Sequence, residues 1–94
     1  MGISKIIPQG TLTVGEVEAL EQHDKFDSTY VILEFSGDVI TFVLEHTDGR
    51  AVGLHCDHDS GEWDAVAKGD DVDVVLKETA DWLDDDMDRA IDEL

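Results

Sequence analysis

The alternation of apolar and polar residues is clearest in the middle of the chain. Between residues 29 and 67, β-branched and aromatic residues form short runs that are separated by turn signals. The strongest signal is Asp48-Gly49, because this pair tolerates the backbone angles of a tight hairpin turn. The pattern predicts a four-stranded antiparallel meander, with strands near residues 29–36, 39–47, 50–57 and 62–67.

The segment before the meander predicts a short helix near residues 14–24. Thr13 and Glu16 match the S/T-x-x-E capping box, and apolar residues follow at helical spacing. A competing interpretation makes residues 11–24 a strand, because Gly15 weakens the helix. The sequence leaves both interpretations open.

After Gly69 the apolar residues recur every three or four positions, which predicts one long amphipathic C-terminal helix. Aspartates gather at its start, where carboxylates cap free N–H groups and meet the positive end of the helix dipole. An alternative places a fifth strand at residues 72–76 and begins the helix after Thr79, because apolar residues alternate there. The residues with helical spacing are Val72, Leu76, Ala80, Leu83, Met87, Ala90, Ile91 and Leu94.

Together these elements predict an α+β fold in which a four-stranded antiparallel meander carries a short N-terminal helix and a long C-terminal amphipathic helix. A chain of 94 residues can close one modest core, so residues 1–94 are expected to form a single domain. We also expect Trp63 and Trp82 to anchor the last strand to the long helix.

The strand register suggests how the sheet is covered. A two-residue turn at Asp48-Gly49 pairs Leu44 with Gly53 and Phe42 with His55, and both faces of the sheet are then apolar. If both helices lie on one face, the second face needs a partner, which predicts a homodimer through that face. The alternative is a monomer whose helices sandwich the sheet.

The net charge of the chain indicates the kind of medium in which it folds. Twenty-four acidic and six basic residues give a net charge of −18 at pH 7, and sixteen of the acids are Asp. This charge opposes the compact state unless salt screens it, with a Debye length of about 3 Å at 1 M against about 10 Å at 0.1 M. In its preference for Asp over Glu, its few Lys residues and its low pI, the chain resembles small cytoplasmic proteins of halophilic archaea. The resemblance covers composition alone and implies a halophile. The charge itself predicts salt-dependent stability and non-specific binding of hydrated cations along the acidic surface.

The cysteine content and the hydropathy of the chain indicate where in the cell the protein is expected. Cys56 is the only cysteine and cannot form an internal disulfide, which fits a reducing cytoplasm. No apolar run approaches the roughly 18 residues of a membrane span, and the start of the chain lacks a signal-like segment. We therefore expect a cytoplasmic protein that does not associate with membranes.

The segment His55-Cys56-Asp57-His58-Asp59 combines side chains that hold transition metals. Successive side chains on a strand point to opposite faces, so Cys56 is less suited than the others. The candidate metal ligands are therefore His55, Asp57 and His58, with a dimer-related copy completing the shell. No other cofactor is expected.

Motifs for catalysis and for direct nucleic-acid binding are missing. The chain has no phosphate-binding loop and no nucleophile elbow, and its carboxylates are too numerous to mark an acid–base pair. Its six basic residues are dispersed, whereas nucleic-acid affinity needs clustered cations. Carboxylates at regular spacing on the long helix could instead imitate a phosphate backbone and occupy a protein partner. These are Asp81, Asp84, Asp85, Asp88 and Asp92.

The leading hypothesis is thus a non-enzymatic, homodimeric small binding or accessory module of a halophile. The first alternative is a small transition-metal-binding protein that uses the segment from His55 to Asp59. The second is an acidic DNA-mimic inhibitor of a nucleic-acid-binding partner.

Overall fold

A computed structural model describes residues 10–57 and 59–92, and for residues 86–92 the backbone alone. In this part of the chain, five strands and two α-helices form the α+β fold that the sequence predicts, with a single 3₁₀ turn, η1, after the first helix. The elements are β1 (Leu12–Thr13), α2 (Val14–Ala19), η1 (Leu20–Gln22), β2 (Phe26–Phe35), β3 (Asp38–His46), β4 (Ala51–Cys56), β5 (Trp63–Gly69) and α3 (Val72–Asp92).

The sheet contains the predicted meander and one short additional strand. Strands β2, β3, β4 and β5 pair in sequence order, each antiparallel to the next. Strand β1 pairs with β3 where Leu12 lies opposite Val39, and Val39 also lies opposite Glu34 of β2. The two strand partners of Val39 must lie on opposite sides of β3, so β1 and β2 flank β3. Strand β4 pairs with a later part of β3 on the same side as β1.

The start of each helix is fixed by a side chain close to it in sequence. The Glu16 N–H donates to Thr13 Oγ1 (3.1 Å) and the Thr13 N–H donates to Glu16 Oε1 (2.9 Å), which forms the capping box. The Asp73 N–H donates to Asp71 Oδ1 (3.0 Å) at the beginning of α3. The helical interpretation is therefore confirmed for α2. Residues 72–76 belong to helix α3, so the alternative that places a strand there is wrong.

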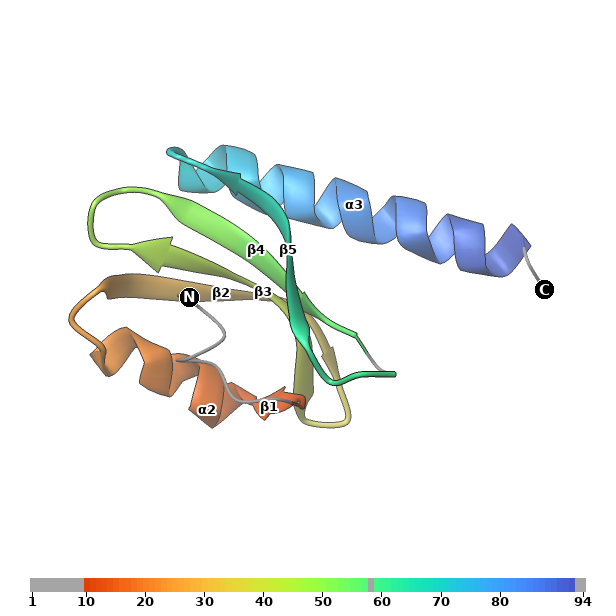
Figure 1. Cartoon of the computed structure of the whole chain (residues 1–94), viewed down its shortest axis with the longest axis horizontal. Coiled ribbons are helices and arrows are strands. Elements are labelled where there is room, and N and C mark those ends of the chain that lie inside the picture. Colours follow the sequence, from red (N-terminus) through yellow and green to blue (C-terminus); the bar gives the residue numbers. More distant parts are fainter. Residues whose placement is uncertain (1–9, 58, 93–94) are drawn as a thin grey trace.

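The two helices lie on opposite faces of the sheet (Figure 1). On the α2 side, a core cluster contains Val17 together with Phe42, Leu44 and other residues of the sheet. On the α3 side, a second cluster contains Val75 together with Val43 and Ala51. The expectation that both helices share one face was therefore wrong. The observed layers match the alternative in which the helices sandwich the sheet. The homodimer was predicted to cover a sheet face that carries no helix, and because each face carries one, the homodimer stays a prediction without that support.

Helix α3 packs directly on strand β4 at Gly53. A Cβ atom at this position would overlap the side chain of Thr79, which is fully buried. The Thr79 hydroxyl donates to the carbonyl oxygen of Val75 (2.7 Å), so the threonine is satisfied within the helix and presents a small surface to the sheet. Gly53 therefore sets how closely the long helix approaches β4.

The hairpin between β3 and β4 has a register one residue away from the predicted one. Leu44 lies opposite Val52, not opposite Gly53. The His46 N–H donates to the Arg50 carbonyl oxygen (2.7 Å) and the Gly49 N–H donates to the His46 carbonyl oxygen (3.0 Å). With Gly49 at φ 95°, this is a three-residue loop ending in a left-handed glycine.

Each helix covers only part of its face. Helix α2 packs against β1, β2 and β3, whereas α3 packs against β3, β4 and β5. On the α2 side, the described residues therefore leave the surface of β4 and β5 uncovered near the β3–β4 hairpin. None of the described helices is both long enough and apolar enough to cross a membrane.

Candidate functional site

An open pocket of about 530 Å³ lies on this uncovered surface. Its volume is within the range of about 300–1,000 Å³ that is usual for small-molecule sites. Residues of β2, β3, β4 and β5 form its base, and the turn into α3 forms one wall. The lining residues are Phe26, Leu44, His46, Arg50, Ala51, Val52, Lys68, Gly69 and Asp70.

The observed register builds this pocket from cross-strand rows. Leu44 of β3, Val52 of β4 and Lys68 of β5 lie side by side across the sheet. His46 and Arg50 face each other at the base of the hairpin and form the next row on the same face. Two rows from three strands thus place apolar side chains beside cationic ones.

The floor of the pocket belongs to the hydrophobic core. Phe26 is 7% exposed and Leu44 is 1% exposed, and both are members of the core cluster on the α2 side. The Phe26 ring lies 5.2 Å from the His23 ring and meets the His46 ring edge-on at 6.1 Å. Because these side chains are held by packing, the floor keeps its shape without a ligand.

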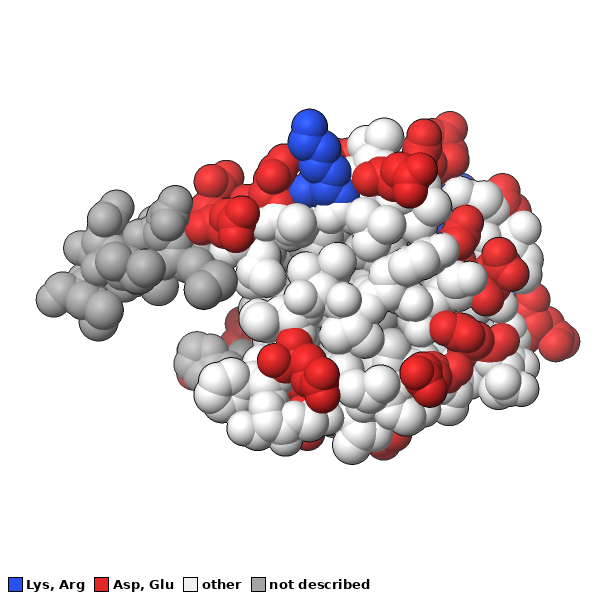
Figure 2. Space-filling model, turned by 180° about the vertical axis from the view of Figure 1, so that it is seen from behind, with Lys and Arg blue, Asp and Glu red and all other residues white. Residues whose placement is uncertain are grey.

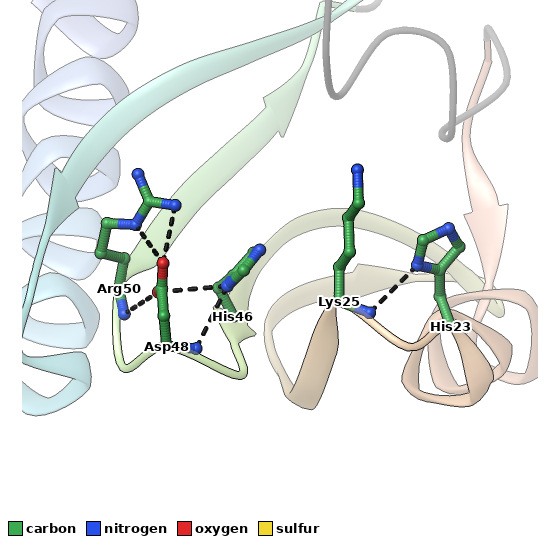
Figure 3. Close-up of polar contacts among 5 residues, drawn as sticks. All are labelled: His23, Lys25, His46, Asp48 and Arg50. Carbon is green, nitrogen blue, oxygen red and sulfur yellow. Dashed lines mark hydrogen bonds and ion pairs between the residues drawn. The ribbon is translucent and has the colours of Figure 1, made fainter.

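Arg50 is held in place at the rim by Asp48 (Figure 3). The Asp48 Oδ2 atom accepts from Nε and Nη2 of Arg50, each at 2.7 Å, and its Oδ1 atom accepts from the Arg50 backbone N–H (3.0 Å). These hydrogen bonds to Arg50 lower the pKa of Asp48 from 3.8 to about 2. A guanidinium has five N–H donors, so the clamp leaves three of them for other acceptors.

His46 presents a further polar edge. Its Nδ1 atom accepts from the Asp48 N–H (3.2 Å) and lies 3.1 Å from Asp48 Oδ1. In a neutral ring whose Nδ1 accepts, the proton is on Nε2, which becomes a donor at the other side of the ring. Lys25 lies beside this loop, because its carbonyl oxygen accepts from the Thr47 N–H (2.9 Å), and in Figure 3 its side chain stands between His46 and His23.

The fold brings together cations that are far apart in the sequence. Four Lys and Arg side chains are described, and Arg50 and Lys68 line the pocket while Lys25 lies next to its wall. Lys77 of α3 is the fourth. These residues are dispersed in the sequence, and only the strand register shows that positions 25, 50 and 68 meet at one end of the sheet.

The predicted metal ligands serve other contacts. His55 Nδ1 lies 2.8 Å from Thr41 Oγ1, and the His55 ring packs against the Trp82 ring of α3 at an angle of 57°, with the ring centroids 4.9 Å apart. Asp57 Oδ1 accepts from the N–H groups of Asp59 (2.8 Å) and Ser60 (3.3 Å), which shapes the turn before β5.

Among the residues that the structure describes, no three His, Cys, Asp or Glu side chains form a group that could hold a metal ion. His58 lies outside the described residues, so the metal site stays a prediction. Cys56 is 2% exposed, and burial raises the pKa of its thiol.

The two tryptophans have separate roles. Trp82 connects α3 to β4 through His55, whereas the sequence predicted a contact with the last strand, β5. Trp63 lies in the cluster on the opposite side of the sheet, where its ring meets Phe42 edge-on at 5.2 Å. Its indole N–H donates to the Gly10 carbonyl oxygen (3.0 Å), so Trp63 fixes the start of the described chain and not α3.

Comparison with known proteins gives a family without an assigned activity. No curated protein and no solved structure matches the chain. A family model described as a domain of unknown function, DUF7964, matches residues 4–94, which is nearly the whole sequence. The chain, with its meander and its two helices on opposite faces, therefore belongs to the DUF7964 family.

Proposed function

We propose that this protein is a non-enzymatic binding module that holds a small ligand in the pocket beside the β3–β4 hairpin. The observation that carries the proposal is a pocket of about 530 Å³ that joins a packed apolar floor to a rim of hydrogen-bond donors. Sites for small molecules combine these two features, because apolar area supplies affinity and a few polar groups supply orientation.

The lining favours binding over chemistry. Among the described residues that line the pocket there is no Ser, Thr or Cys, so these residues offer neither a hydroxyl nor a thiol as a nucleophile. The carboxylate nearest to His46 and Arg50 is that of Asp48, which is occupied in positioning Arg50. These features support a role in recognition and give no support to a reaction.

The proposal is tested by mapping where a small apolar probe binds. We would titrate the protein with naphthalene-1-methanol in molar KCl and follow the amide NMR resonances. Binding in the pocket shifts the resonances of Leu44, Val52 and Lys68 and leaves those of α2 unchanged. Shifts confined to other surfaces, or no shifts at all, would contradict the proposal.

A pair of variants tests the same site by filling it. Val52→Trp places a large ring on the pocket floor and should abolish the shifts. Val31→Trp makes the same exchange at an exposed position of β2 outside the pocket and should leave them unchanged. Amide spectra of both variants, recorded without probe, establish that the sheet is formed before the comparison is made.

The wider setting that we propose for this module is the cytoplasm of a halophile. The homodimer and the two alternative functions stay predictions. The metal alternative rests on the segment from His55 to Asp59, and the DNA-mimic alternative rests on acids of α3, of which Asp81, Asp84 and Asp85 are exposed. The pocket supports neither alternative, because it involves none of these residues.

A further inference from the structure

The distribution of charge indicates the kind of molecule that the pocket takes. This inference rests on the proposed function: we infer that the ligand of the pocket is a small organic anion whose apolar body lies on Phe26, Leu44 and Val52. The anionic group would then lie between Arg50 and Lys68 at the rim. The inference follows from the contrast between this rim and the rest of the surface.

Acids outnumber Lys and Arg by four to one in the whole chain, with 24 against six. Among the described residues that line the pocket the order is reversed, because two cations, Arg50 and Lys68, accompany one acid, Asp70. Lys25 and the donor edge of His46 add to the positive side, and Asp48 on the other side is bound to Arg50. A cation would find carboxylates on almost any surface of this molecule, whereas an anion finds donors here.

Arg50 and Lys68 are prepared for such a group. The clamp from Asp48 fixes the plane of the Arg50 guanidinium before any ligand arrives, which lowers the entropic cost of binding. Among the side chains that the structure describes, residues 10–57 and 59–85, no carboxylate forms an ion pair with the Lys68 ammonium. A planar fork beside a point charge suits a carboxylate, whose two oxygens accept from both.

The net charge of −18 does not prevent this binding in a salty medium. A Debye length of about 3 Å at 1 M salt screens the repulsion between an approaching anion and distant carboxylates. Direct hydrogen bonds between charged groups act at contact distance and are screened much less. Salt therefore removes the long-range obstacle and leaves the local contacts at the rim to decide the affinity.

Three probes with the same apolar body test the inference. Naphthalene-1-carboxylate, naphthalene-1-methanol and naphthalene-1-methylammonium are titrated by calorimetry in molar KCl. We expect the carboxylate to bind at least about tenfold more tightly than the alcohol, since hydrogen bonds to charged groups contribute that much. The ammonium probe should bind more weakly than the alcohol.

Matched lysine variants locate the effect. Lys68→Gln should weaken carboxylate binding about tenfold and leave alcohol binding unchanged, because only the charged hydrogen bond is lost. Lys77→Gln removes the same charge from an exposed position on α3, outside the pocket, and should change neither. Lys68 is exposed on an edge strand, so its replacement is compatible with folding.

The outcomes separate this inference from the proposed function. Equal affinity for the carboxylate and the alcohol would overturn the inference while leaving the pocket as a binding site. An equal loss in the Lys68→Gln and Lys77→Gln variants would also overturn it, because affinity would then follow net charge. Failure of all three probes to bind would overturn both.

Discussion

Asp48 shows how one side chain can organise a site without lining it. Its two oxygens hold the Arg50 guanidinium and the Arg50 backbone N–H, and the same carboxylate lies beside His46. The Arg50 hydrogen bonds favour the ionised form, which lowers the pKa of Asp48. Asp48 is therefore a positioning residue that keeps its charge well below the pH at which an ordinary aspartate takes up a proton.

The pH dependence of this contact can be measured. The Asp48 carboxyl resonance should titrate with a midpoint of about 2, against the ordinary value of 3.8. A lowered pKa in the folded state means that the contact contributes stability above pH 3.8 and that this contribution is lost as pH falls through about 2. Arg50→Gln should return the midpoint toward its ordinary value, while Lys77→Gln should not. An ordinary midpoint in the unaltered protein would contradict the clamp.

Cys56 gives a second prediction for a single residue. Its thiol is buried, and burial raises its pKa, so little of the reactive thiolate forms at neutral pH. A disulfide reagent in molar KCl should modify the folded protein at least about tenfold more slowly than the urea-unfolded chain, because reaction requires local opening. Equal rates would show that Cys56 is accessible in the folded state.

At the scale of elements, the sequence predicts structure where neighbouring residues decide it. The capping box of Thr13 and Glu16 starts α2, and Asp71 caps α3, as local chemistry indicates. The loop after His46 is different, because Asp-Gly suits both a two-residue turn and a three-residue loop that ends in a left-handed glycine. The choice between these loops shifts β4 by one residue and decides which side chains share a face.

This shift explains why the candidate site could not be predicted. With the predicted two-residue turn, His46 lies opposite Ala51, and the row of Leu44, Val52 and Lys68 does not form. The observed loop places Arg50 opposite His46 and completes the pocket. The sequence does not predict on which face of the sheet α2 lies either, because this depends on the short pairing of β1 with β3.

The contact between α3 and β4 supports a prediction about glycine. Gly53→Ala should lower the free energy of unfolding by about 1–3 kcal/mol, because the new methyl group overlaps the Thr79 side chain. Thr79→Ala in the same chain removes the overlapping hydroxyl and methyl groups and should recover part of the loss. Urea unfolding in molar KCl measures each variant.

Gly15→Ala is the matched control for this prediction. Gly15 lies in α2, and a Cβ there would meet only ordinary contact with Thr13 Oγ1 at 3.9 Å. Alanine is the better helix former, so this change should raise stability by about 0.5–1 kcal/mol. Similar losses at both positions would mean that the backbone, and not the packing of α3, determines the effect at Gly53.

On the face of the molecule that Figure 2 shows, carboxylates surround a broad area of residues other than Lys, Arg, Asp and Glu, and a few carboxylates lie within it. Strand β2 carries the most exposed large apolar residues of the described sheet, with Phe35 70% and Val31 40% exposed. Its pairing with β3 is interrupted near Asp27 and near Ile32, and such irregularities discourage pairing between the edges of separate molecules. The homodimer stays a prediction, which light scattering in molar KCl tests, and these irregularities argue against its forming by pairing along the edge of β2.

The acidity of the molecule predicts that its stability depends on salt. Exposed carboxylates Asp81, Asp84 and Asp85 stand three and four residues apart on α3, where like charges repel. Transfer from molar KCl to dilute buffer should lower the free energy of unfolding by about 2–3 kcal/mol. This corresponds to a fall in Tm of roughly 10–20 °C for a domain of this size.

Replacing these three residues with Asn tests the cause of that dependence. The triple variant removes repulsion without removing core contacts, so its Tm should fall less on transfer to dilute buffer. Sucrose strengthens burial without screening charge, and it should therefore restore less of the lost stability than KCl does. Near-UV dichroism reports whether packing follows Tm. If dichroism and Tm are unchanged in dilute buffer, carboxylate repulsion does not limit folding, and the inference of a halophilic setting loses its physical basis.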